Sequence, residues 1–191
     1  MTRLAVTPQD LATTRFALSP VADAVAALAM FARRRRPPWL ADWVDRHRPA
    51  YREIVAEPVA GALAGVLRNT RWIPDFITPP PLAMDTTIEA ELAMIAATPA
   101  ERAHADLALG ADGPVPAALD RPDVAEQVAA ALREVWGRLL APHWPRRRAL
   151  LERDVVQRAG RLATYGWPSA LDGMGPNIRW LPTGHSSTGE A

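Results

Sequence analysis

Apolar side chains recur at helical spacing along residues 122–163, the most regular stretch of the chain. A residue at every third or fourth position lies on one face of an α-helix, so the pattern predicts a helix with one buried stripe. Many alanines and the absence of a run of β-branched residues favour a helix over a strand. The stripe before residue 142 consists of Val124, Val128, Ala131, Leu132, Val135 and Leu139.

Two prolines interrupt this stretch. Pro142 and Pro145 flank His143 and Trp144, and beyond them the apolar pattern restarts and continues to Leu162. A proline inside a helix removes a backbone hydrogen bond and clashes with the preceding turn. We therefore expect two helices, or one kinked helix, that meet at this motif and pack both arms on one core.

Short motifs predict where other helices begin. Thr7 and Ser19 can each cap a helix, and each precedes a proline that suits the first helical position. Thr87 precedes another periodic apolar segment, and Thr98 opens a capping-box pattern that ends at Glu101. These starts and the long stretch predict a mostly α, multi-helix domain with a kinked long C-terminal helix.

A proline-rich loop interrupts the helical pattern at residues 72–81. Pro74 and the triplet at residues 79–81 disfavour a regular helix and favour an extended chain. The loop has too many apolar residues for a free linker, so we expect it to pack on the helices. The side chains expected to be buried are Trp72, Ile73, Phe76 and Ile77.

The two ends of the chain carry short apolar segments. Residues 4–6 and 178–181 are strand candidates that could pair in a small β-ribbon joining the termini. Residues 184–191 are small and polar, which is typical of disorder. We therefore predict a single helical domain over residues 1–182 and a disordered tail over residues 183–191.

Composition narrows the functional classes. The formal net charge of +1 argues against a strongly basic nucleic-acid-binding domain, and the absence of cysteine excludes disulfides and thiolate metal sites. The start of the chain lacks the apolar core of a signal peptide, and no apolar run is long enough to span a bilayer. Abundant Ala, Arg and Pro without Lys suggest a GC-rich bacterial genome. We expect a cytoplasmic bacterial protein with no membrane partner.

Four segments together resemble a known family. They are residues 16–20, the Pro-Asp-Phe-Ile-Thr-Pro-Pro loop at 74–80, the Ala-Pro-His-Trp-Pro motif that opens residues 141–154, and Ile-Arg-Trp at 178–180. They are similar to the uncharacterised helical N-terminal domain of actinobacterial regulators, where it precedes a winged helix-turn-helix of the ArsR type. No second domain of the expected size follows Trp180, so the resemblance implies DNA binding only through a domain missing from this chain.

The resemblance implies a non-catalytic accessory domain with a ligand-sensing or dimerising role, and hence a candidate homodimer. The alternative is a self-standing helical small-molecule-binding protein or an enzyme of unknown reaction. We predict no catalytic residue and no cofactor, because neither a Gly-x-Ser-x-Gly elbow nor a phosphate-binding glycine loop occurs.

Charged and metal-ligating residues favour structural interpretations over functional ones. The arginine run at residues 33–36 is typical of a solvated helix end, and one arginine of residues 146–148 is expected to pair with an acid. The histidines His47, His104, His143 and His185 are far apart in sequence, so we predict no metal site.

Aromatic residues near the proline motif suggest a pocket for a small organic ligand. We place it between the kinked helix and the proline-rich loop, with aromatic walls and polar contacts from His143 or Asp75. A dense, ligand-free core is the alternative for the same side chains. The candidate ligand-binding residues are Trp72, Asp75, Phe76, Trp136, His143 and Trp144.

Overall fold

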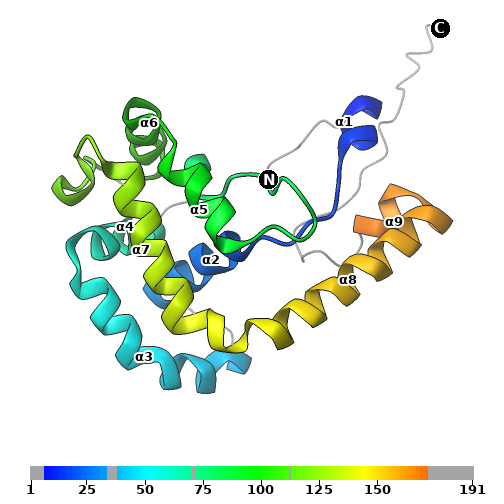
Figure 1. Cartoon of the computed structure of the whole chain (residues 1–191), viewed down its shortest axis with the longest axis horizontal. Helices are drawn as coiled ribbons and strands as arrows, with labels where there is room; N and C mark the ends of the chain where they lie inside the picture. Colours follow the sequence, from blue (N-terminus) through cyan, green and yellow to red (C-terminus); the bar gives the residue numbers. More distant parts are fainter. Residues whose placement is uncertain (1–6, 34–37, 70–71, 112, 172–191) are drawn as a thin grey trace, which may run out of the picture. The chain divides into compact units, whose positions relative to one another are not determined.

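The computed structural model describes residues 7–33, 38–69, 72–111 and 113–171 (Figure 1). Every regular element in these ranges is a helix or a helical turn and none is a strand, so the mostly α fold class is confirmed. None of the described helices is both long and apolar enough to cross a lipid bilayer. Residues 4–6 and 178–181 of the expected β-ribbon, and the tail 183–191, lie outside the described residues.

The chain divides into two compact units. One is Ala17–Arg148, and the other combines Met1–Phe16 with Ala149–Ala191. The boundary falls within α8 (Trp144–Tyr165), so one continuous helix belongs to both units. The single domain over residues 1–182 stays a prediction.

The larger unit is built from antiparallel and crossing helices joined by short helical turns (Figure 1). Its α-helices are α2 (Pro20–Ala32), α3 (Ala41–Ala56), α4 (Pro58–Asn69), α5 (Ile88–Ala96), α6 (Ala100–Gly110) and α7 (Val124–Val135). Its 3-10 turns are η1 (Pro38–Leu40), η2 (Asp75–Ile77), η3 (Ala117–Leu119) and η5 (Ala141–His143), and η4 (Trp136–Leu140) is π-helical.

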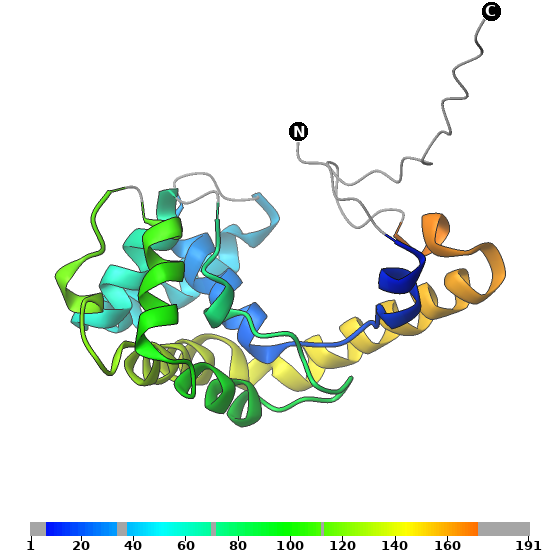
Figure 2. The ribbon, with the colours of Figure 1, turned by 90° about the horizontal axis from the view of Figure 1, so that it is seen from above.

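The smaller unit contains α1 (Pro8–Thr13), most of α8, and α9 (Trp167–Leu171). A turn at Gly166, with a φ of 78° that favours glycine, reverses the chain between α8 and α9 (Figure 2). The guanidinium of Arg158 donates to the carbonyl of Ala170 at 2.9 Å, which holds α9 against α8. The rings of Phe16 and Trp167 contact each other, with centroids 5.9 Å apart.

Three predicted helix starts are confirmed by their caps. Thr7 and Asp10 form a reciprocal capping box at α1, and these hydrogen bonds lower the pKa of the Asp10 carboxyl. The hydroxyl groups of Ser19 and Thr87 each accept a backbone N–H from the first turn of α2 and α5, respectively. Polar side chains therefore set these boundaries as the sequence indicated.

Helix α7 forms the centre of the larger unit. It packs against α2, α3, α4, α5 and α6, and most of its predicted stripe is buried. The side chains of Val124, Val128 and Leu132 are fully buried, whereas Ala131 is half-buried. The full set of buried α7 residues is Val124, Ala125, Val128, Ala129, Leu132 and Val135.

The predicted interruption after α7 has a more complex form than a simple kink. The chain widens into the π-helical η4, tightens into the 3-10 turn η5, and enters α8 at Trp144. Pro142 lies at the start of η5 and Pro145 in the first turn of α8, where a proline costs no intrahelical hydrogen bond. Both prolines therefore mark helix starts.

The expectation that both arms pack on one core stays a prediction for the part of α8 beyond Arg148, which belongs to the other unit. No residue of α8 is buried, and Leu150 and Val156 are 62% and 68% exposed. The face of α8 that carries the half-buried Leu151 and Val155 also carries Arg158, so its apolar stripe is sparse. Within the larger unit, α7 and η4 supply buried residues to the hydrophobic core, and Trp144 at the start of α8 packs against it partly buried.

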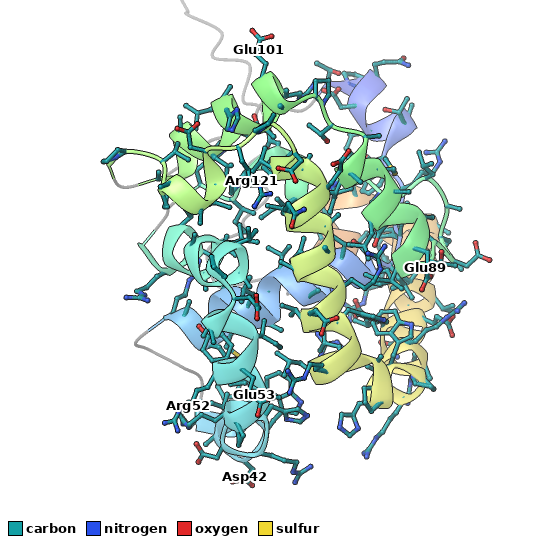
Figure 3. All side chains as sticks on the ribbon, turned by 60° about the vertical axis from the view of Figure 1, so that its left-hand side comes forward. Asp42, Arg52, Glu53, Glu89, Glu101 and Arg121 are labelled. Carbon is teal, nitrogen blue, oxygen red and sulfur yellow. The ribbon has the colours of Figure 1, made fainter. Side chains whose placement is uncertain are left out.

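Charged side chains link the interruption to neighbouring helices within the larger unit. Arg147 makes a two-pronged ion pair with Asp23 in the first turn of α2, with Nη2 to Oδ1 at 3.0 Å, which raises the pKa of the guanidinium. This confirms that one of the arginines at residues 146–148 pairs with an acid. Arg138 of η4 pairs with Glu53 of α3, which Figure 3 labels.

The proline-rich loop is only partly buried. Phe76 and Ile77 are 5% and 0% exposed, as predicted, but Trp72 and Ile73 are 48% and 41% exposed, which corrects the prediction for these two. The loop approaches α6 at Gly110, where an added Cβ would lie 3.2 Å from Pro74 Cγ and 3.3 Å from the Trp72 carbonyl oxygen. The loop thus contacts α6 through the ring of Pro74 and the backbone of Trp72, and the side chains of Trp72 and Ile73 stay exposed.

We predict that Phe76→Ala lowers the free energy of unfolding by about 3–5 kcal/mol, through lost apolar burial and a cavity. Ile73→Ala is the matched control in the same loop and should cost less than about 1 kcal/mol, because Ile73 is exposed. Urea denaturation of both variants measures the difference. Equal costs would contradict the assignment of Phe76 to the core.

Candidate functional site

A pocket of about 550 Å³ opens beside the proline-rich loop within the larger unit. One wall comes from η2 and the prolines that follow it, and the other from the end of α5 and the start of α6. Most of its lining is apolar, with a few polar groups, as is usual for small-molecule sites. The lining residues are Asp75, Phe76, Thr78, Pro79, Pro80, Met94, Ala97, Thr98, Pro99 and Arg102.

The η2 wall is fixed by backbone hydrogen bonds. The N–H of Phe76 donates to Oδ2 of Asp106 on α6 at 3.0 Å, and the N–H of Thr78 donates to the carbonyl of Asp75 at 3.1 Å. Burial of the Phe76 and Ile77 side chains anchors the same turn. Asp106 was not among the residues singled out from the sequence, because its partner is a backbone group 30 residues away.

The opposite wall is the tight turn between α5 and α6. The Thr98 N–H donates to the Ile95 carbonyl at 2.9 Å, and the Thr98 hydroxyl donates to the Met94 carbonyl at 3.4 Å. The capping box predicted from Thr98 to Glu101 is therefore wrong, because the hydroxyl bonds backwards to α5. Pro99 takes the N-cap position, and none of the described side chains caps α6.

Two side chains of opposite charge line this pocket. Asp75 and Arg102 are both exposed, and neither forms an ion pair within the part of the chain that the structure describes. Between the two walls the surface is supplied by Phe76, Met94 and prolines. A ligand here would meet an apolar surface with one anionic and one cationic group at its edge.

The structure does not bring all predicted ligand-binding residues to this pocket. Asp75 and Phe76 line it, but Trp72, Trp136, His143 and Trp144 are not among its lining residues. The Trp136 and Trp144 rings instead contact each other edge to face at 4.8 Å between centroids. His143 contacts the ring of His47 at 5.7 Å between centroids.

His47 belongs to a chain of aromatic contacts between α2 and α3. Its ring stacks on Trp43 at 4.6 Å, and Trp43 contacts Phe31 at 5.3 Å. Phe31 in turn stacks on Tyr51 at 4.6 Å. The Nδ1 atom of His47 lies 2.8 Å from the Trp43 carbonyl, a geometry in which the ring N–H donates. These contacts indicate a packing role for the residues of the Pro-His-Trp-Pro motif and its neighbours.

Glu91 is a buried acid that the sequence reasoning missed. Glu91 is 0% exposed, and its Oε2 accepts the Val21 N–H at 2.8 Å. Its Oε1 has no hydrogen-bond partner among the residues that the structure describes. Burial raises the pKa of the Glu91 carboxyl, while the bonds from Val21 and the Ser19 hydroxyl act in the opposite direction. The sequence pattern that could have predicted its burial is its place on the apolar face of a helix, between Ile88 and Ile95.

Comparison with protein-family models, with curated proteins and with solved structures finds no match to this chain. Among the described residues, no three His, Cys, Asp or Glu side chains are grouped so that they could hold a metal ion.

We predict that Glu91→Gln makes the protein about 1 kcal/mol more stable at pH 7, because it removes a buried charge and keeps an acceptor for the Val21 N–H. A raised pKa means that the folded chain binds the proton more tightly than the unfolded chain. Glu91 thus contributes most to the free energy of unfolding at a pH below its ordinary pKa of 4.5. This contribution is lost as the pH rises through the pKa of Glu91 in the folded protein. The advantage of the variant should shrink toward acidic pH.

Chemical denaturation of both proteins between pH 4 and 8 would measure this difference. Glu89→Gln is the matched control, because Glu89 projects from the same helix into solvent (Figure 3). Loss of the Glu89 negative charge near the start of α5 should lower the stability of the folded protein slightly at neutral pH. A Glu91→Gln variant that is less stable than the parent at pH 7 would show that the bond to Val21 outweighs the cost of burial.

Proposed function

We propose that this chain is the non-catalytic N-terminal accessory domain of an ArsR-like transcriptional regulator, with ligand sensing as its principal role. The pocket beside the proline-rich loop carries the proposal, because two of the predicted ligand-binding residues, Asp75 and Phe76, line it. Its volume of about 550 Å³ suits a small organic molecule. The proline-rich loop and the Pro-His-Trp-Pro motif resemble those of the helical N-terminal domain of ArsR-type regulators, and this resemblance is the reason for proposing a regulator.

The second role implied by the resemblance is dimerisation. A homodimer is part of the proposal as an alternative role, and sedimentation equilibrium of the 191-residue chain tests it directly. The remaining alternative is a self-standing helical small-molecule-binding protein or an enzyme of unknown reaction, located in the cytoplasm like the regulator. The same pocket would serve that protein, so pocket occupancy alone does not separate the two functions.

The gene sequence that follows the codon for Ala191 separates the regulator domain from the self-standing protein. A winged-helix segment encoded in frame after Ala191 supports the regulator, whereas a stop codon at that position favours the self-standing protein. In the longer protein, Ala97→Trp would fill the pocket from its α5 side, and Ala105→Trp on an exposed position of α6 is the control. A regulator that senses ligands here should change its operator affinity with the first variant and not with the second.

We predict that residues 1–191 alone do not bind DNA sequence-specifically, because the net charge of +1 provides little attraction to phosphates. Fluorescence anisotropy at physiological salt, with a random-sequence duplex as the control, measures this. Submicromolar binding that depends on sequence would overturn the division of roles between this chain and a separate DNA-binding domain.

A further inference from the structure

The polar groups of the pocket restrict the kind of molecule that it can hold. Asp75 and Arg102 both line it, yet no ion pair joins them. A ligand with one charge would satisfy one of these groups and leave the other beside the bound molecule. A ligand that carries both an ammonium and a carboxylate group complements both.

The cationic side of the pocket favours a carboxylate. The guanidinium of Arg102 offers paired N–H donors that match the two oxygens of a carboxylate. Arg102 lies in the first turn of α6 beside Glu101, and the positive end of the helix dipole at this turn also favours an anionic group. On the opposite wall, the Asp75 carboxylate accepts hydrogen bonds only, which suits an ammonium group.

The apolar part of the pocket calls for a compact apolar side group. Phe76 and Met94 offer flat and adaptable contact surfaces, and Pro79, Pro80 and Pro99 make rigid walls. Because prolines have little backbone freedom to lose, a ligand does not have to order this loop when it binds. The hydrogen bond from the Phe76 N–H to Asp106 fixes the turn that presents Asp75.

We propose that this pocket binds a small zwitterionic organic molecule of the amino-acid type. Its carboxylate pairs with Arg102, its ammonium group with Asp75, and its apolar side group packs on Phe76, Met94 and the prolines. The inference rests on the proposed function only in that it takes this pocket to be the sensing site, and it specifies the ligand class.

Three probes of matched shape test the charge requirement on the full 191-residue chain. They are L-phenylalanine, which carries both charges, 3-phenylpropanoate, which carries only the carboxylate, and 2-phenylethylamine, which carries only the ammonium group. Titrations followed by amide chemical shifts of Phe76, Thr78 and Thr98 locate the binding and give the Kd. L-Methionine and L-leucine extend the panel to other apolar side groups.

We expect at least one zwitterion to bind with a Kd at least tenfold below that of either singly charged probe, since each charged hydrogen bond contributes about a factor of ten or more. Arg102→Gln should remove the preference for carboxylates, and Asp75→Asn the preference for ammonium groups. Arg133→Gln on α7 and Glu101→Gln are matched controls at exposed positions outside the pocket, and Figure 3 shows Glu101 projecting from the start of α6.

Equal affinity for zwitterions and singly charged probes would overturn the inference, as would millimolar or weaker binding of every zwitterion tested. Binding that persists in both pocket variants would place the ligand elsewhere and overturn it too. Circular dichroism of each variant confirms that it is folded. None of these results depends on a winged-helix segment after Ala191, so failure of the ligand class and failure of the regulator proposal are read from separate experiments.

Discussion

The buried face of α7 is the contact on which the larger unit depends. It packs against α2, α3, α4, α5 and α6, so one helix supplies part of the core for five others. Fully burying a side chain such as Leu132 contributes about 1.5–3 kcal/mol relative to leaving it exposed. Several helices contact the same buried side chains of α7. Displacing one of these helices would therefore disturb the packing of the others.

The candidate site is positioned by that core through α5. This helix packs on α7, and it carries both the buried Glu91 and the pocket residue Met94. Glu91 connects α5 to the first turn of α2 through the Val21 N–H, while its other carboxylate oxygen has no partner within the described part of the chain. A buried polar group of this kind specifies how two helices meet, although an apolar residue of similar size would give more stability. The pocket is therefore lined in part by a helix, α5, whose position against α2 and α7 is set by buried contacts.

Local patterns were sufficient to predict much of the fold. The α7 stripe, the caps at Thr7, Ser19 and Thr87, and the interruption before α8 depend on residues within a few positions of one another. The exposure of α8 could not be predicted in the same way. Its apolar residues recur at helical spacing, but whether they are buried depends on a facing surface that local spacing does not identify.

The candidate site was harder to predict, because its contacts join distant segments. The loop was rightly expected to pack on helices, but its partner is the α5–α6 turn, and the bond from the Phe76 N–H to Asp106 spans 30 residues. Aromatic composition pointed to Trp136, His143 and Trp144. The rings of Trp136 and Trp144 instead contact each other, and the ring of His143 contacts that of His47. Tryptophan fits a core as well as a pocket, so residue type alone does not distinguish the two.

The π-helical segment η4 links this arrangement to the proposed regulatory role. A π-turn accommodates an extra residue in a helix, and such turns recur at functional positions. The segment directly follows α7, which packs on the helix that carries Met94, and it precedes the continuous helix α8. A ligand that shifted α5 would thus act on α7 just before the point where the helix is least regular. Under the regulator proposal, the packed helices α5 and α7 are the elements that join the pocket to η4.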